Sequence, residues 1–119
     1  MKNLVILIFM FSIPSLSFAE NLLLLRKDKE YTSYYEPDTI RRTQQLVMVW
    51  TVEKKDGRKH SEYLTEFDCN QGMYRQISLR TFASDSKVIS GDAIYRAWFD
   101  VPPTTQVLGI LFSKLCTAN

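Results

Sequence analysis

The sequence predicts an α+β fold, an antiparallel β-sheet of about five to six strands with one C-terminal helix. Segments rich in β-branched and aromatic residues recur between turn-forming residues from 22 to 99, which is typical of strands. Apolar residues change to helical spacing after the double proline Pro102-Pro103. Two cysteines, Cys69 and Cys116, are placed so that a disulfide would tether this helix to the sheet.

The first 19 residues have the features of a secretory signal peptide. Lys2 gives a positive start, an apolar stretch runs from Leu4 to Ile13, and Ser17-Phe18-Ala19 offers small residues for cleavage. The apolar stretch is shorter than the roughly 20 residues that span a bilayer, so we expect no stable membrane insertion after cleavage. The mature protein is then a single domain of residues 20–119.

The cleavage site also predicts the location of the mature protein. A bacterial lipoprotein would carry a cysteine directly after the cleavage site, and Glu20 occupies that position here. We therefore expect a periplasmic or secreted protein in an oxidising compartment.

Two short segments open the predicted sheet. Leu22 to Arg26 is an apolar run suited to a first strand, and Glu30 to Ile40 is rich in tyrosine and interrupted by a turn at Pro37-Asp38. In an extended segment, Tyr31 and Tyr35 would lie on one face and Tyr34 on the other.

The clearest element is a β-hairpin. Gln45 to Lys54 is rich in β-branched and aromatic residues, Asp56-Gly57 is a strong signal for a two-residue turn, and His60 to Cys69 returns as the partner strand.

A two-residue turn sets a register for this hairpin. Trp50 would face Tyr63 and Leu46 would face Phe67, so these residues and Cys69 would share the core face. The opposite, half-exposed face would carry Val47, Val49, Leu64, Glu62 and Glu66.

The remaining sheet follows from the next turns. Asn70-Gln71-Gly72 leads into a third strand, Met73 to Ala83, in which Tyr74 would pair with Phe67 and Arg75 with Glu66. A last strand is predicted from Ala93 to Phe99, with Trp98 in the core.

The C-terminal helix has an apolar stripe formed by Val107, Leu108, Leu111, Phe112 and Leu115. Thr104 or Thr105 is the expected N-cap, and the helix should end near Cys116.

Composition excludes several classes of function. The mature chain has 14 basic and 13 acidic residues, a net charge of about +1, which gives no general attraction to nucleic acid. His60 is the only histidine and is expected on the solvated surface, and no CxxC spacing occurs, so we expect no enzyme, no cofactor and no metal.

The hairpin turn is the first candidate binding surface, because Lys54, Lys55, Arg58 and Lys59 surround Asp56-Gly57. Like charges that face each other across strands cost stability, so folding alone does not explain the cluster. Two interpretations stay open: the cluster engages an acidic glycan or acidic protein patch, or it is a solvated turn that limits edge pairing. Arg41-Arg42, with Tyr34, form a second candidate contact surface.

Several motifs occur in a recognisable order. They are Tyr34-Tyr35-Glu36-Pro37-Asp38-Thr39-Ile40, Val49-Trp50, Glu66-Phe67-Asp68-Cys69, Tyr74-Arg75, Val101-Pro102-Pro103-Thr104 and the final Cys116. Together, over roughly residues 31–116, they resemble the surface-adhesin protein E family, small exported bacterial proteins with one disulfide. The resemblance implies an antiparallel sheet with a helix tethered by the Cys69–Cys116 disulfide.

The resemblance also implies a function. The family's named member is an outer-membrane lipoprotein that binds host matrix and serum glycoproteins, so we expect an exported binding module for host matrix or envelope glycoproteins. The alternatives are a periplasmic enzyme inhibitor of the lysozyme-inhibitor kind, presenting a loop at Ser90-Gly91-Asp92, or an accessory subunit of an envelope complex. The identity of the partner and a homodimeric state stay open.

Overall fold

The computed structural model describes residues 21–83, 88–90 and 97–117. The strands are β1 (Leu23–Lys27), β2 (Tyr31–Tyr35), β3 (Arg41–Thr43), β4 (Leu46–Lys55), β5 (Arg58–Asp68), β6 (Met73–Phe82), β7 (Val88–Ser90) and β8 (Phe99–Asp100), with a 3-10 helix η3 (Pro37–Thr39) and a helix α2 (Val107–Cys116). The signal peptide, its cleavage site and most of the predicted strand Ala93 to Phe99 lie outside the described residues.

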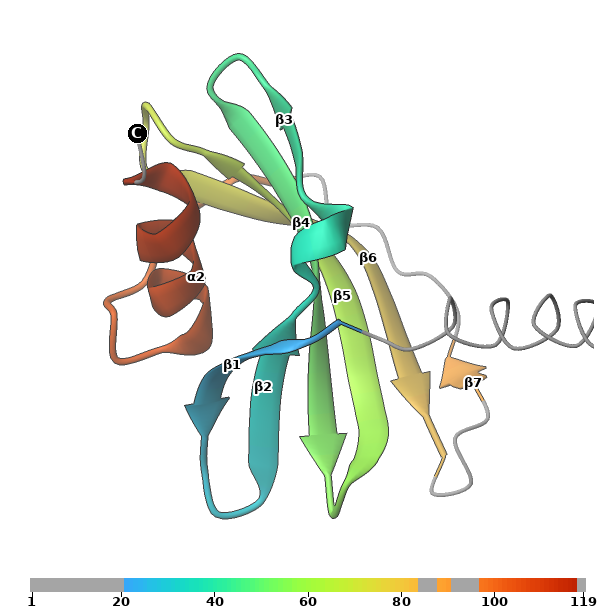
Figure 1. Cartoon of the computed structure of the whole chain (residues 1–119). Coiled ribbons are helices and arrows are strands. Elements are labelled where there is room, and N and C mark those ends of the chain that lie inside the picture. Colours follow the sequence, from blue (N-terminus) through green and yellow to red (C-terminus); the bar gives the residue numbers. More distant parts are fainter. Residues whose placement is uncertain (1–20, 84–87, 91–96, 118–119) are drawn as a thin grey trace, which may run out of the picture.

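The strands form one antiparallel sheet, with α2 beside one part of it (Figure 1). The neighbouring strands follow the order β1-β2-β4-β5-β6-β7, while β3 pairs with the beginning of β4 and β8 with the beginning of β6. This arrangement confirms the predicted α+β fold with a C-terminal helix. The short strand β7 was not predicted, because it is only three residues long and its last residue, Ser90, begins the turn signal Ser90-Gly91-Asp92.

The predicted hairpin is present, and its turn has the expected backbone. Asp56 and Gly57 have φ angles of 53° and 76°, both in the left-handed region that a tight two-residue turn requires. Lys55 pairs directly with Arg58 across this turn. The hairpin β4–β5 therefore begins in the predicted register.

One extra residue then shifts that register. Lys54 pairs with Lys59, but the next residue, Glu53, pairs with Ser61, so His60 is left without a partner on β4. Such a β-bulge inserts one residue into one strand of the pair. From Glu53 onward the predicted register is wrong by one residue.

The bulge reverses which residues of β4 face the core, whereas Tyr63 and Phe67 of β5 are buried as predicted. Trp50 lies opposite Leu64 instead of Tyr63, and the buried face carries Val47, Val49 and Phe67. A slip of one residue moves side chains between the faces of a sheet, because they alternate along each strand. The prediction that Val47 and Val49 occupy the half-exposed face is therefore wrong.

The core lies between this face and α2. Val49, Phe67 and Leu111 are fully buried, and Leu115 is nearly so. The rings of Phe67 and Phe112 meet edge to face with centroids 5.7 Å apart. The predicted apolar stripe of the helix therefore packs on the sheet, as its spacing indicates.

Two tryptophans predicted in the core lie instead on the half-buried opposite side. The Arg80 guanidinium lies 5.4 Å from the ring centroid of Trp50, and that of Arg75 lies 4.6 Å from Trp98. Arginines on this side also form ion pairs, Arg80 with Glu62 at 3.2 Å and Arg75 with Glu66 at 2.7 Å. The predicted pairing of Glu66 with Arg75 is confirmed, as is that of Phe67 with Tyr74.

The close approach of the Pro102-Pro103 segment to α2 depends on a glycine in the helix. A Cβ at Gly109 would overlap the carbonyl oxygens of Pro102 and Pro103, because this segment lies against the helix. The N-cap is Gln106, without a side-chain hydrogen bond, so the prediction of a Thr104 or Thr105 cap is wrong. The start of the helix therefore has no capping side chain, and the Pro102-Pro103 segment packs against its first turn.

The two cysteines form the predicted disulfide. Cys69 directly follows β5 and Cys116 is the last residue of α2, and their Cα atoms are 5.3 Å apart. The bridge thus ties the end of the helix to the end of a central strand, on the side where Phe67 is buried.

Candidate binding surface

The tip of the β4–β5 hairpin brings together the four cations predicted there, and we call Lys54, Lys55, Arg58 and Lys59 the basic tip. Lys54 lies directly opposite Lys59, and Lys55 directly opposite Arg58. Like charges directly opposite each other destabilise a strand pair. Sheet pairing therefore gives no reason for this arrangement.

Aromatic rings from the neighbouring strands lie beside three of these cations. The rings paired with lysine ammonium groups are Tyr34 with Lys54 at 5.5 Å, Tyr31 with Lys55 at 5.7 Å and Phe82 with Lys59 at 5.8 Å. A cation over an aromatic face gains about 0.5–1 kcal/mol at an exposed site. Tyr34 was predicted as a contact residue. Its predicted place on the face of β2 opposite to Tyr31 and Tyr35 agrees with the pairing of β2 and β4.

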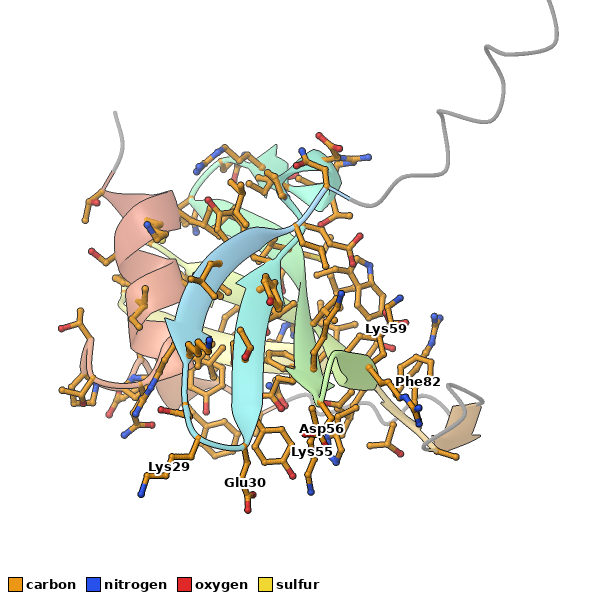
Figure 2. All side chains as sticks on the ribbon, turned by 60° about the horizontal axis from the view of Figure 1, so that its bottom comes forward. Lys29, Glu30, Lys55, Asp56, Lys59 and Phe82 are labelled. Atoms are coloured by element: carbon orange, nitrogen blue, oxygen red, sulfur yellow. A yellow bond between two sulfur atoms is a disulfide. The ribbon has the colours of Figure 1, made fainter. Side chains whose placement is uncertain are left out.

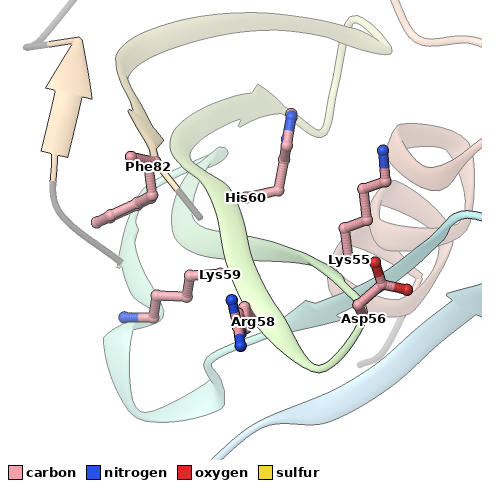
Figure 3. A pocket seen from close by; sticks show the side chains of 7 residues that line it. Lys55, Asp56, Arg58, Lys59, His60 and Phe82 are labelled. Atoms are coloured by element: carbon pink, nitrogen blue, oxygen red, sulfur yellow. The ribbon is translucent and has the colours of Figure 1, made fainter. Parts of the chain in front are cut away.

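A pocket of about 480 Å³ opens at the basic tip (Figure 3). Its lining residues are Lys55, Asp56, Arg58, Lys59, His60, Phe82 and Ala83. The pocket thus combines three cationic side chains with one carboxylate and one aromatic wall. Sequence reasoning missed Phe82, because its place beside the hairpin depends on pairing between β5 and β6.

His60, the extra residue of the bulge, is half-buried rather than solvated as predicted. Its ring meets that of Tyr31 edge to face with centroids 5.0 Å apart. Its Nδ1 atom is buried and has no hydrogen-bond partner. The bulge therefore adds an aromatic contact between β5 and β2 beside the pocket.

Positive charge is concentrated at this edge of the sheet. In the view of Figure 2, Lys29 and Glu30 of the β1–β2 turn lie along the same edge as Lys55 and Asp56. Residues 27–30 and 54–59 together hold six cations and three carboxylates, although the chain from residue 20 onward is almost neutral. Local charge of this kind attracts anionic partners where the net charge of a protein does not.

The second predicted surface is separate from the basic tip. Arg41 and Arg42 are exposed on β3, where they pair with Met48 and Val47 at the other end of β4. Met48 and Lys55 are seven residues apart, or about 23 Å along a strand. The structure therefore brings Tyr34 to the basic tip, but neither of these arginines.

Tyr63 stands between the core and the basic tip. It is 7% exposed, and burial, with a smaller contribution from the negative charge of Glu53, raises its pKa well above the usual value. The phenol therefore stays neutral where an exposed tyrosine would ionise.

The acidic residues and the histidine of the described part of the chain form no cluster suited to a metal ion. Among residues 21–83, 88–90 and 97–117, no group of three histidine, cysteine or acidic side chains is placed to hold a metal ion. Glu62 and Glu66, which share one face of β5, are engaged by arginines. The loop Ser90-Gly91-Asp92, the basis of the inhibitor alternative, lies largely outside the described residues.

These features define a small disulfide-linked sheet domain with a cationic surface suited to binding. Residues 22–117 match the family model of surface-adhesin protein E, and the chain belongs to this family. Neither the curated proteins nor the solved structures give a significant match. The family implies an adhesin-like binding protein rather than an enzyme.

The family and the disulfide agree on location. Surface adhesins act outside the cytoplasm, and disulfides persist in oxidising compartments. In the portion that the structure describes, no helix has the length and apolar character to cross a membrane.

Proposed function

We propose that this protein is exported through the signal peptide at residues 1–19 and acts as a non-catalytic binding module in the periplasm or after secretion. Its partner is a glycoprotein of the host matrix or of the bacterial envelope, recognised by the basic tip. The observation that carries this proposal is the two pairs of directly opposed like charges, Lys54 with Lys59 and Lys55 with Arg58.

The opposed charges support binding because they weaken the free hairpin. An anionic partner on one face of the hairpin would lie near both members of one pair and so relieve their repulsion. The placement of like charges opposite each other is then favourable in the complex and unfavourable in the free protein.

The scaffold supports the proposal as well. Preorganised binding surfaces lose less conformational entropy on association than mobile ones. Lysine side chains held over aromatic rings and a hairpin continuous with the disulfide-linked core both reduce that loss.

The proposal is tested with exported protein isolated from the bacterial envelope or the culture medium. The immobilised protein is exposed to a panel of matrix glycoproteins and to an envelope extract. The double variant Lys55→Gln with Arg58→Gln is compared with Arg41→Gln and Arg42→Gln, which removes the same charge at the other end of β4.

We expect one partner to be captured, and its capture to fall about tenfold or more in the Lys55/Arg58 variant only, since hydrogen bonds to charged groups are strong. Equal capture by both variants would show that the basic tip is not the binding surface. Capture of no glycoprotein from either source would reject the proposed function.

A further inference from the structure

We infer that the pocket at the basic tip binds a sulfate or phosphate group carried by a carbohydrate chain. This inference rests on the proposed function, because it names the chemical group that the same surface recognises. It follows from three properties of the pocket: its donors, its aromatic wall and its size.

The donors come from both sides of the hairpin turn. Lys55 precedes the turn and Arg58 follows it, and Figure 3 shows both at the pocket. An ammonium and a guanidinium group together present several N–H donors, which suit an oxyanion with three acceptor oxygens. Lys59 adds a third cation, although it also pairs with Glu62 at 3.5 Å.

The aromatic wall indicates a ligand larger than a free ion. Phe82 lines the pocket beside Lys59, and His60 lines it with its ring against Tyr31. Flat apolar surfaces of this kind pack against the C–H face of a sugar ring, whereas an inorganic ion gains nothing from them. An anionic sugar would use both the cations and the rings.

The size of the pocket agrees with this ligand. About 480 Å³ lies within the range of roughly 300–1,000 Å³ that small-molecule sites occupy. A sulfate or phosphate group would fill only a part, and the attached sugar would fill more of it. An extended acidic protein patch would not enter a concave site of this kind.

Asp56 sets a further constraint on the ligand. Among the described residues that line the pocket, Asp56 carries the only carboxylate, and it repels an anion. Asp56 has a φ of 53°, a conformation that asparagine also tolerates. Asp56→Asn should therefore preserve the turn and tighten binding.

The test measures dissociation constants at 0.15 M salt for the exported protein with three probes. Heparin carries sulfate groups, dextran phosphate carries phosphate groups, and chemically desulfated heparin keeps the carboxylates of the same chain. We expect heparin or dextran phosphate to bind about tenfold or more tightly than desulfated heparin, and the stronger of the two identifies the source of the group.

The variants locate the site. Lys55→Gln with Arg58→Gln should weaken binding about tenfold or more, Arg41→Gln with Arg42→Gln by less than about twofold, and Asp56→Asn should strengthen it about threefold. Equal binding of the desulfated chain, or equal losses in both double variants, would overturn the inference.

A separate measurement distinguishes this inference from the proposed function. The glycoprotein captured by the basic tip is treated with glycosidases and tested again. Loss of capture supports the inference, while retention means that the protein moiety is recognised, so the function stands and the inference fails. Binding of heparin without capture of any glycoprotein leaves the inference standing and rejects the proposed function.

Discussion

The two ends of the β4–β5 hairpin contrast in what stabilises them. At one end Val47 and Phe67 are buried beneath α2, and the disulfide follows directly at Cys69. At the other end the strands extend away from the helix (Figure 1), and Lys54 faces Lys59. Stability is therefore concentrated at the covered end, which leaves the basic tip able to hold unfavourable charges for binding.

The largest effect should come from the disulfide. Replacing Cys69 and Cys116 by serine opens a loop of about 48 residues and should lower the free energy of unfolding by about 4 kcal/mol. Urea denaturation of both proteins measures this loss. Adding a reductant should reproduce it in the wild type and leave the serine variant unchanged; equal stability of the two proteins would contradict a stapling role.

A pair of phenylalanines compares the two ends directly. Phe67→Ala removes a fully buried ring and should cost about 3 kcal/mol or more, whereas Phe82→Ala at the half-buried tip should cost about 1 kcal/mol. Denaturant midpoints at constant slope give both values. Similar losses would mean that the tip contributes to stability as much as the core does.

A substitution in α2 tests how tightly the helix packs at the covered end of the hairpin. Gly109→Ala introduces a methyl group into the Pro102 and Pro103 carbonyl oxygens and should lower stability by about 2 kcal/mol. Ser113→Ala, on the same helix, is the control, since alanine favours helix formation. A stabilising effect of Gly109→Ala would show that the proline segment can move aside.

Tyr63 lies between the covered end of the hairpin and the basic tip. We expect its raised pKa to lower the stability of the protein in alkali. Its pKa is raised in the folded state, so the stability linked to it is complete below about pH 10, the pKa of an unfolded tyrosine. Above that pH the unfolded chain releases the proton first, and stability should fall by about 1.4 kcal/mol per pH unit. Tyr63→Phe, compared with wild type at pH 7 and pH 11, should lose less stability; equal losses would show that this phenol ionises in the folded protein.

The smallest effect should appear at the basic tip. Lys54→Gln removes one member of an opposed pair and should raise stability by about 0.5 kcal/mol at low salt, with a smaller gain at high salt. Thermal unfolding at two ionic strengths measures the difference. A loss of stability would indicate that the contact of Lys54 with Tyr34 outweighs its repulsion from Lys59.

Much of the fold follows from local sequence signals. The Asp56-Gly57 turn and the Asn70-Gln71-Gly72 turn each determine the pairs next to them, so Lys55 with Arg58 and Phe67 with Tyr74 could be predicted. The bulge at His60 has no such signal, because any residue can be the extra one. That single residue was enough to exchange the predicted core and exposed faces of β4, while Phe67 on β5 kept its predicted place in the core.

The candidate site also has a part that the local sequence predicts and a part that depends on the whole sheet. The four cations of the basic tip are neighbours in the chain, so their proximity could be predicted from the turn. The rings of Tyr31 and Phe82 reach them only through pairing with β2 and β6, which depends on the whole sheet. Arg41 and Arg42 are close to the hairpin in sequence but belong to its opposite end.

The Cys69–Cys116 bridge also determines how the protein would respond to mechanical tension. The bonded residues are 47 positions apart, so a chain pulled from its ends cannot straighten the segment that contains β6 and α2. At about 3.4 Å per residue, this removes about 160 Å from the fully stretched length. Under tension the chain would thus lengthen over a shorter distance, and Cys116 at the end of α2 would stay beside the end of β5.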